Sequence, residues 1–310
     1  MDRIVSLVLG VVVSLAAAGV HAQAWQPAPG HPQLPLWPAA MPDSQPVQGP
    51  ETVTTAPRNE WVAGRPWRYV RNVSTPTLTV YPPRGRNTGA AVVVFPGGGY
   101  EILAIDLEGT EACDWLTSRG ITAVLLKYRV PCRVVGPHRE CPMALMDAQR
   151  AMGLVRLHAR EWHVDPHKVG VLGFSAGGHM VAALSTQYEQ RLYGPVDAAD
   201  RESCRPDFAV ALYPGHLADP QQGSVLNPDV HVTARTPPTF LAQAEDDPVD
   251  PVENSLVYYA TLRKAGVPAE LHVFPHGGHA FGLRRTGQPI TRWPELVETW
   301  LRGLGMIAGR

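Results

Sequence analysis

The sequence predicts an α/β fold with a mostly parallel sheet of eight strands and helices on both faces of that sheet. Strand-like and helix-like patterns alternate along most of the chain, which is the order that parallel sheets produce. Two strand-like runs, at 90–95 and 121–126, are apolar at nearly every position, as strands buried on both faces are. The 31 prolines and 29 glycines favour many short elements joined by tight turns over a helical bundle.

The individual elements follow from these patterns in chain order. The first two strands are expected to pair as a hairpin, ahead of the alternating strands and helices. About 25 residues separate the strand that ends near Tyr213 from the next one, which leaves no room for a large lid. The expected strands are 67–73, 77–81, 90–95, 121–126, 169–172, 208–212, 240–242 and 271–274, and the expected helices are 110–119, 144–160, 177–186, 252–264 and 293–301.

The first 24 residues have the features of a secretory signal peptide. Asp2 and Arg3 precede an apolar run over 4–20, and Ala22 and Ala24 supply small residues before a cleavage site. The alternative is an uncleaved membrane anchor, but the run is shorter than the ~20 residues that a spanning helix needs. We therefore expect cleavage after Ala24, a periplasmic or secreted location and no stable membrane anchor.

The rest of the chain is predicted to hold one domain behind an N-terminal arm. Residues 25–58 contain nine prolines and little periodicity, so they are expected to form an extended arm that wraps the surface or is mobile. Residues 59–310 carry all of the alternating elements. With 45% hydrophobic residues the chain can bury a sizeable core. Its 27 basic and 28 acidic residues give no basic excess, which argues against a nucleic-acid partner.

Export makes the four cysteines candidates for disulfides. Cys132 and Cys141 flank a short loop, and a bridge between them is expected to contribute ~2.5–3 kcal/mol on the chain-entropy model. Cys113 lies in a predicted helix and Cys204 in a loop. These two either pair or remain buried thiols, and the sequence does not decide between the alternatives.

The strand at 169–172 is followed by the motif Gly-Phe-Ser-Ala-Gly, with Ser175 at its centre. A G-x-S-x-G motif between a strand and a helix is the setting of a nucleophile elbow, a tight turn that lifts the serine hydroxyl above the sheet. Side chains at Gly173 and Gly177 would clash in such a turn. We therefore predict that Ser175 is a nucleophile.

A serine hydroxyl needs a base, and the base needs a carboxylate that orients it. The last strand is followed by two histidines, of which His279 is favoured over His276 because small residues precede it. The strand around Phe240 is followed by Glu-Asp-Asp-Pro at 245–248, so the chain order is serine, carboxylate, histidine. A metal site built on His276 and His279 lacks a third ligand at suitable spacing. His179, next to the elbow, is expected to form a structural hydrogen bond.

Ester chemistry through a serine also needs amide donors for the negative oxygen of the tetrahedral intermediate. One is predicted to be the amide of Ala176, at the start of the helix after the elbow. Others are expected from the loop after the strand at 90–95, whose sequence is Pro-Gly-Gly-Gly-Tyr. Consecutive glycines let backbone amides approach a substrate oxygen closely.

Seven segments together carry a resemblance to a known family. They are FPGGGY at 95–100, LKYRVP at 126–131, DAQR at 147–150, GFSAGGH at 173–179, SCRPDF at 203–208, YPG at 213–215 and HGGH at 276–279. With them the chain resembles secreted esterases of the α/β-hydrolase superfamily, in the bacterial acetylxylan esterase-like branch that is also labelled xylanase-associated. The segments span nearly the whole chain after residue 24, so the resemblance implies the α/β-hydrolase fold.

The resemblance also implies roles for individual residues. In related esterases the second and third glycines of a His-Gly-Gly-Gly motif donate to the oxyanion; here Pro96 replaces the histidine, and the two donors correspond to Gly98 and Gly99. The spacing of the family's acid to the following Pro-Val-Glu-Asn-Ser selects Asp247. Asp246 and Asp250 remain alternatives, since the acid at Asp250 departs from the family pattern.

The predicted function is hydrolysis of short-chain esters through an acyl-enzyme on Ser175, with an apparent pKa of ~6–7 from a histidine base. Neither a metal nor a cofactor is expected. A small-molecule or polysaccharide ester is the expected partner, and the resemblance implies acetylated sugars or xylan. The alternatives are a general carboxylesterase or lipase, a serine peptidase and an inactive carbohydrate-binding homologue.

Overall fold

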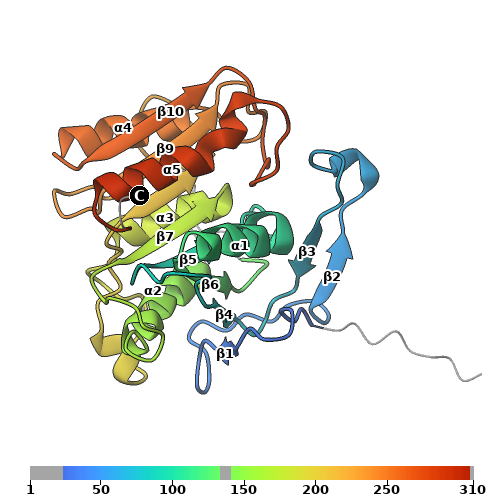
Figure 1. The fold of residues 1–310 in the computed structure, drawn as a ribbon, viewed down its shortest axis with the longest axis vertical. Coiled ribbons are helices and arrows are strands. Elements are labelled where there is room, and N and C mark those ends of the chain that lie inside the picture. Colours follow the sequence, from blue (N-terminus) through green and yellow to red (C-terminus); the bar gives the residue numbers. More distant parts are fainter. Residues whose placement is uncertain (1–23, 133–140, 308–310) are drawn as a thin grey trace, which may run out of the picture.

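The fold is built on one eight-stranded sheet in the order β1-β4-β6-β5-β7-β8-β9-β10 (Figure 1). The computed structural model describes residues 24–132 and 141–307. The strands β5 to β10 run parallel to one another. At one edge of the sheet, β4 pairs antiparallel with β6, and β1 pairs antiparallel with β4. The bounds are β1 Gln33–Pro35, β4 Thr77–Tyr81, β5 Ala91–Phe95, β6 Thr122–Lys127, β7 Val169–Phe174, β8 Ala209–Leu212, β9 Thr239–Ala244 and β10 Ala269–Phe274. The predicted mostly parallel sheet is thus confirmed.

Helices cover both faces of this sheet. Right-handed crossovers place α1 on one face and α2, α3 and α4 on the other, because the chain moves in opposite directions along the sheet after β5 and after β6. The helix α5 shares the face of α1, where the rings of Trp115 and Trp293 are 5.2 Å apart. The bounds are α1 Glu111–Ser118, α2 Pro142–Leu157, α3 Ala176–Thr186, α4 Glu253–Lys264 and α5 Trp293–Gly303.

The core is apolar because the central strands are buried along their full length. Every residue of β5, with the sequence AVVVF, is buried, and so is every residue of β7 and β9. Helices on both faces remove these side chains from water, which is the main driving force for folding. The apolar run at 90–95, which predicted a strand buried on both faces, is therefore such a strand, β5.

The predicted hairpin of the first two strands is wrong. The strand β3, Arg68–Arg71, pairs with β2, Thr52–Thr55, in a separate two-stranded sheet, and β4 pairs with β1 and β6. The run at 67–73 has the composition of a strand, but its partner lies in the Pro-rich segment, where no strand was expected. Between β8 and β9, at 213–238, the structure has no helix or named strand.

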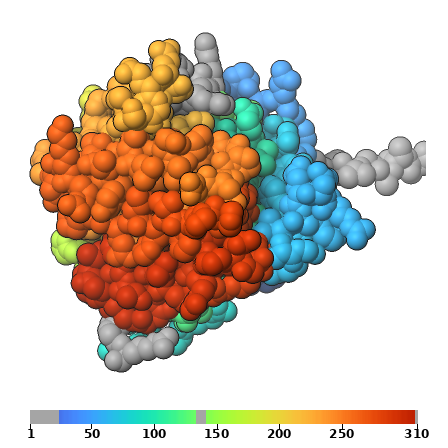
Figure 2. Space-filling model, turned by 90° about the horizontal axis from the view of Figure 1, so that it is seen from above, coloured from blue at the N-terminus to red at the C-terminus, as the bar shows by residue number. Residues whose placement is uncertain are grey.

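The Pro-rich segment is part of the folded body in its described residues. It supplies β1 and β2, and the side chains of Trp25, Leu36 and Trp37 are buried in the core. Figure 2 shows the light-blue segment around 50–70 packed beside the orange and red C-terminal part of the chain, where Arg284 Nη1 donates to the carbonyl of Arg65 at 2.8 Å. An arm that only wraps the surface would bury fewer large side chains.

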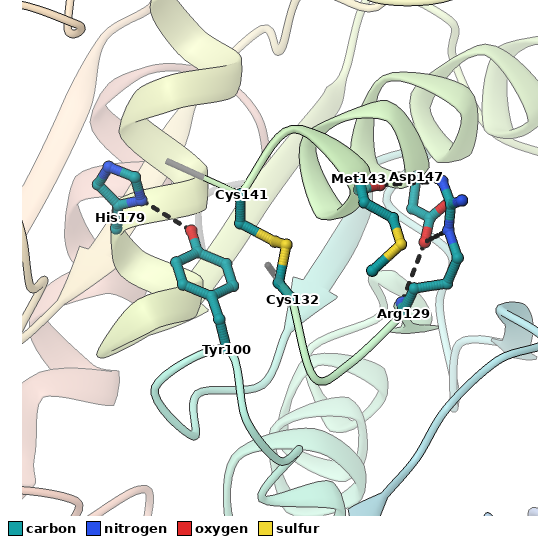
Figure 3. Close-up of a disulfide and its surroundings, with 7 residues drawn as sticks. All are labelled: Tyr100, Arg129, Cys132, Cys141, Met143, Asp147 and His179. Atoms are coloured by element: carbon teal, nitrogen blue, oxygen red, sulfur yellow. Dashed lines mark hydrogen bonds and ion pairs between the residues drawn. A yellow bond between two sulfur atoms is a disulfide. The ribbon is translucent and has the colours of Figure 1, made fainter. Parts of the chain in front are cut away.

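The expected signal peptide lies outside the described residues. Within the two ranges that the structure covers, no helix has the length and apolar character needed to cross a membrane. A disulfide joins Cys132 to Cys141, on either side of 133–140 (Figure 3). Cys113 and Cys204 are separate, buried thiols.

Candidate active site

The site lies where the direction of the chain along the sheet reverses. After β5 the chain crosses to β6 on one side, and after β7 it crosses to β8 on the other. Loops that follow neighbouring strands diverge at such a point and leave a crevice outside the carboxyl ends of the strands. The Pro96–Gly99 loop follows β5 and Ser175 follows β7, so the fold itself places these two segments together.

Ser175 occupies a strained turn between β7 and α3. Its backbone has φ 53° and ψ −121°, a conformation that residues with a side chain rarely adopt. A Cβ on Gly173 would lie 2.2 Å from the carbonyl oxygen of Gly177, and a Cβ on Gly177 would lie 2.1 Å from that of Phe95. Both glycines are therefore required by close backbone contact, as the motif predicts.

His279 lies between Ser175 and Asp247. Its Nε2 is 3.0 Å from Ser175 Oγ, and its Nδ1 is 2.7 Å from Asp247 Oδ2. Asp247 is held in turn by the amides of Val249 and Asp250, which donate to its Oδ1 at 2.9 and 3.0 Å. In this arrangement Nδ1–H donates to the carboxylate, so Nε2 can accept the proton of the serine.

The environment of His279 favours its protonated form. Burial lowers the pKa of the imidazole, but the hydrogen bond and charge of Asp247, followed by the charges of Asp250 and Glu108, raise it above the ordinary value. An imidazolium formed during a reaction would be stabilised by these same carboxylates. The site is therefore suited to a base that takes up a proton and later returns it.

The neighbouring Asp246 and His276 have a different task. Asp246 Oδ1 accepts hydrogen bonds from the amides of Gly277 and Gly278, both at 2.9 Å, and its Oδ2 lies 3.2 Å from His276 Nδ1. These contacts hold the pKa of Asp246 below its usual value, with the amide of Gly278 as the largest cause. Asp246 thus fixes the loop that carries His279, while neither Asp246 nor His276 contacts Ser175.

The three predicted amide donors surround the serine. Gly98 and Gly99 line the same cavity as Ser175, with φ values of 131° and 63° that favour glycine. A Cβ on Gly98 would lie 2.3 Å from the carbonyl oxygen of Ile102, so no other residue fits there. Ala176 is the first residue of α3, where backbone amides lack helical partners. Within the described part of the chain, the amides of Gly98 and Gly99 have no acceptor.

The carboxylate of Glu108 is hydrogen-bonded to the glycine loop that carries Gly98 and Gly99. It is buried in the π-helical turn Ile105–Thr110, where its Oε2 accepts from the amide of Gly97 and its Oε1 from the hydroxyl of Tyr213, both at 2.8 Å. The Tyr213 hydroxyl also accepts from the amide of Gly282 at 3.2 Å, and its ring packs edge-on against His279. One carboxylate thereby connects the glycine loop to the loop of the histidine.

The carboxylate of Asp250 also lies within hydrogen-bonding distance of the serine. Asp250 Oδ2 lies 3.2 Å from Ser175 Oγ and 3.8 Å from His279 Nε2. Asp250 is therefore not the partner of Nδ1, which Asp247 occupies. The cavity above these groups has a volume of about 390 Å³ and is lined, among others, by Trp67, Gly98, Gly99, Ser175, His216 and His279.

His179 forms the structural hydrogen bond that its position suggests. The hydroxyl of Tyr100 is hydrogen-bonded to His179 Nδ1 at 2.7 Å, in a buried pair beside the Cys132–Cys141 bridge (Figure 3). Burial, followed by the charge of His216, lowers the pKa of His179 to about 3, so the imidazole is neutral. The backbone amide of His179 donates to the carbonyl of Ser175 at 3.0 Å, and its imidazole, through Tyr100, stabilises the loop after Gly99.

Several groups of the site have no motif in the sequence. Glu108 and Asp250 are single acids among 28, and Trp67, which lines the cavity, directly precedes the strand β3. For Asp250 the sequence did offer a signal, since an acid three residues after Asp247 departs from the family pattern. For Glu108 and Trp67 the placement depends on long-range packing.

The comparisons with known proteins match this geometry. A model of the Prolyl oligopeptidase family matches residues 149–303, and a model named BD-FAE matches residues 78–214. The acetyl ester-xyloside bifunctional hydrolase of Caldicellulosiruptor lactoaceticus superposes with a TM-score of 0.69 at 33% identity, over 89% of this chain and 97% of that one.

Two relatives are larger than this chain. An acetylxylan esterase of Xylanibacter ruminicola is 35% identical over 206 residues, which cover 63% of this chain and 42% of that protein. Endo-1,4-beta-xylanase B of Butyrivibrio fibrisolvens is 30% identical over 205 residues, which cover 61% of this chain and 32% of that protein. The chain therefore spans less than half the length of these two relatives.

Proposed function

Because this chain belongs to the α/β-hydrolase superfamily, in its acetylxylan esterase-like branch, we propose that it is a serine esterase that hydrolyses short-chain, chiefly acetyl, esters of sugars or xylan. The observation that carries this proposal is the hydrogen-bonded series Ser175, His279 and Asp247 beneath an open cavity. The two relatives described above are much longer, and one has a xylanase name, so the natural polysaccharide context is part of the proposal.

The proposed reaction has two half-reactions on one serine. His279 Nε2 takes the proton of Ser175 as Oγ attacks the acyl carbon, and the resulting oxyanion is bound by the amides of Gly98, Gly99 and Ala176. His279 then gives the proton to the leaving alcohol. A water molecule attacks the acyl-enzyme in the same way, with His279 as base, and releases the acid and Ser175.

Asp247 acts on the imidazole rather than on the ester. Its carboxylate accepts from Nδ1–H, which keeps Nε2 facing the serine and stabilises the imidazolium. The contacts of Asp247 to the amides of Val249 and Asp250 fix this orientation before substrate binds. Asp246 is proposed to hold the histidine loop only.

The cavity supports a small acyl group and an exposed alcohol. Its volume of about 390 Å³ lies at the lower end of small-molecule sites, and the segment at 213–238, which contributes His216 to the cavity lining, contains no helix. A long lipid chain would require more covered apolar surface. The expected signal peptide and the Cys132–Cys141 bridge support a periplasmic or secreted location, where disulfides persist.

The test is a substrate panel run on the wild type and on Ser175→Ala. We expect hydrolysis of nitrophenyl acetate to exceed that of longer-chain esters, release of acetate from acetylated xylan, and a loss of ~10³- to 10⁶-fold in kcat for Ser175→Ala with an unchanged circular dichroism spectrum. Wild-type turnover in a folded Ser175→Ala protein would refute the mechanism. Faster cleavage of peptide substrates than of esters would favour a peptidase, the activity that the Prolyl oligopeptidase match suggests.

A further inference from the structure

Asp250 places a second carboxylate against the nucleophile. Its Oδ2 is 3.2 Å from Ser175 Oγ, a hydrogen-bonding distance, while the imidazole Nε2 is 3.0 Å from the same oxygen. The serine proton therefore has two acceptors in the free enzyme. The reaction proposed above uses only the imidazole, so the carboxylate of Asp250 requires its own explanation.

The position of Asp250 is fixed by the surrounding backbone. Its amide donates to Asp247 Oδ1 at 3.0 Å, and its carbonyl accepts from the side-chain amide of Gln243. The carboxylate packs over Gly215, where a Cβ would lie 2.5 Å from Asp250 Oδ1. Any larger residue at 215 would displace the carboxylate, so the structure keeps it beside the serine.

Asp250 lies at the boundary between two cavities. The first is the cavity above Ser175, and the second, which we name the outer cavity, has a volume of about 550 Å³. Both cavities are lined by His216, Val249 and Asp250, so they adjoin at these residues. The lining of the outer cavity includes the polar side chains of Asp219, Glu253 and Asn254.

An ionised carboxylate at this boundary disfavours most ester substrates. Carboxylates accept hydrogen bonds but do not donate them, so Asp250 repels anionic groups and loses hydration against an alkyl group. Its charge also opposes the oxyanion that forms on the substrate. A substrate hydroxyl that donates to Asp250 removes two of these penalties. The hydroxyl replaces the water that the carboxylate loses, and its hydrogen bond weakens the effect of the carboxylate charge on the oxyanion at Ser175.

We propose that Asp250 is a specificity residue that accepts a hydrogen bond from a free hydroxyl of the substrate, next to the ester, and thereby selects esters of sugars over esters of simple alcohols. This inference rests on the proposed esterase function. The rest of the sugar would extend into the outer cavity, where Asp219, Glu253 and Asn254 offer polar partners for hydroxyl groups. With Asp250 engaged by substrate, the serine proton is left to His279, so the hydroxyl raises kcat as well as affinity.

The experiment compares two acetyl esters that differ by one hydroxyl. One is a mono-acetylated methyl xyloside with a free hydroxyl on the adjacent carbon, and the other is the same ester with that carbon deoxygenated. The measured quantity is the ratio of their kcat/KM values. We expect wild-type enzyme to favour the hydroxylated ester by about 10- to 100-fold, the range for a hydrogen bond to a charged group.

The variants Asp250→Val and Asp250→Asn test the residue. In Asp250→Val the ratio should fall to about 1. In Asp250→Asn it should lie between 1 and the wild-type ratio, because the amide oxygen still accepts a hydrogen bond. The matched control is Val249→Ala, which changes the same cavity wall without removing a carboxylate and should keep the wild-type ratio. Thermal unfolding of each variant confirms that it is folded.

Each outcome bears on one proposal. A wild-type ratio near 1, or an unchanged ratio in both Asp250 variants, overturns the role of Asp250. If Asp250→Val does not fold, the wild type and Asp250→Asn still give the ratio. Wild-type enzyme that hydrolyses neither ester, nor nitrophenyl acetate, instead refutes the proposed esterase function.

Discussion

Two adjacent aspartates at the end of β9 face different partners. Asp247 contacts His279 Nδ1 at 2.7 Å, whereas Asp246 accepts from the amides of Gly277 and Gly278. Successive residues at a strand end point in different directions, so only one of them can reach the imidazole. The family spacing that selected Asp247 therefore has a geometric counterpart.

This difference gives the first prediction. Asp247→Asn should lower kcat by orders of magnitude, because the amide allows the wrong tautomer of His279; the corresponding substitution in trypsin lowers kcat ~10⁴-fold. Asp246→Asn, which removes a loop contact on the exposed side, should lower it less than ~10-fold. Both purified variants are assayed on one short-chain ester. If the Asp246 variant proves the more damaged, the assignment of the acid is wrong.

The second prediction concerns pH. His279 acts as base only when neutral, and nearby carboxylates raise its pKa, so kcat/KM should rise with pH through a midpoint above the ~6.5 of an ordinary imidazole. Asp250→Asn removes a negative charge, which favours the neutral imidazole and moves the midpoint to lower pH. A pH–rate profile of both proteins checks this. A flat profile from pH 5 to 9 would contradict a histidine base.

Single residues were predictable where chemistry imposes a local pattern. Ser175 stands in a five-residue motif whose glycines are demanded by contacts of 2.1 and 2.2 Å, and His279 follows the last strand. Glu108 was not assigned a role, and Asp250 was named only as an alternative acid, because their contacts join segments that are far apart in sequence. Glu108 is 105 residues from Tyr213, with which it forms a hydrogen bond.

At the scale of elements, the π-helical turn Ile105–Thr110 connects the two halves of the site. Such turns are rare and occur mostly at functional sites. Here the turn places Glu108 under the glycine loop and beside Tyr213, and the pattern of apolar residues at 110–119 predicted only the regular helix that follows. The irregular turn has no periodic signal of its own.

The third prediction tests this turn. Glu108→Gln replaces one acceptor oxygen by an amide that donates, so either the Gly97 amide or the Tyr213 hydroxyl loses its partner. We expect kcat to fall by about 10-fold or more while KM changes less, since misplaced Gly98 and Gly99 amides affect the transition state chiefly. The exposed Glu101 lies in the same loop, and Glu101→Gln is the control. Equal losses in both variants would contradict a positioning role for Glu108.

Most elements were predictable to within a few residues, and the exceptions share a cause. The core strands are continuous apolar runs because both faces are covered, and the helices between them have clear apolar patterns. The strand β1 has only three residues and contains a proline, so no pattern marks it. The error in pairing β3 with β4 followed from that, since the partner of β3 and one of the two partners of β4 lie in the Pro-rich segment.

At the scale of the whole molecule, a buried ion pair ties the N-terminal segment to the core. Asp147 accepts from Arg129 Nε at 3.0 Å, a pair that Figure 3 shows. Asp147 also accepts from Trp37 Nε1 at 2.8 Å, and Arg129 Nη1 donates to the carbonyl of Pro42 at 2.7 Å. The side chains of Arg129 and Asp147 are 2% and 0% exposed, so neither charge has water as an alternative partner.

The fourth prediction follows from this burial. Asp147→Asn leaves the Arg129 charge without its counter-ion, and loss of one partner of a buried pair costs about 3–5 kcal/mol of unfolding free energy. Urea unfolding followed by tryptophan fluorescence measures the change. Asp114→Asn, on the exposed side of α1, should change the unfolding free energy by less than about 0.5 kcal/mol. Similar values for the two variants would contradict the structural role of the pair.

The short strand β1 also has a consequence for how the chain can be cut. It covers the outer side of β4, and Pro35 within it cannot offer an amide to a further strand. A protein that began at residue 59, the predicted start of the domain, would leave the backbone groups of β4 open to pairing with another molecule. Solubility of the isolated domain therefore depends on keeping the Pro-rich segment, because its strand β1 protects the edge of the sheet from pairing with other molecules.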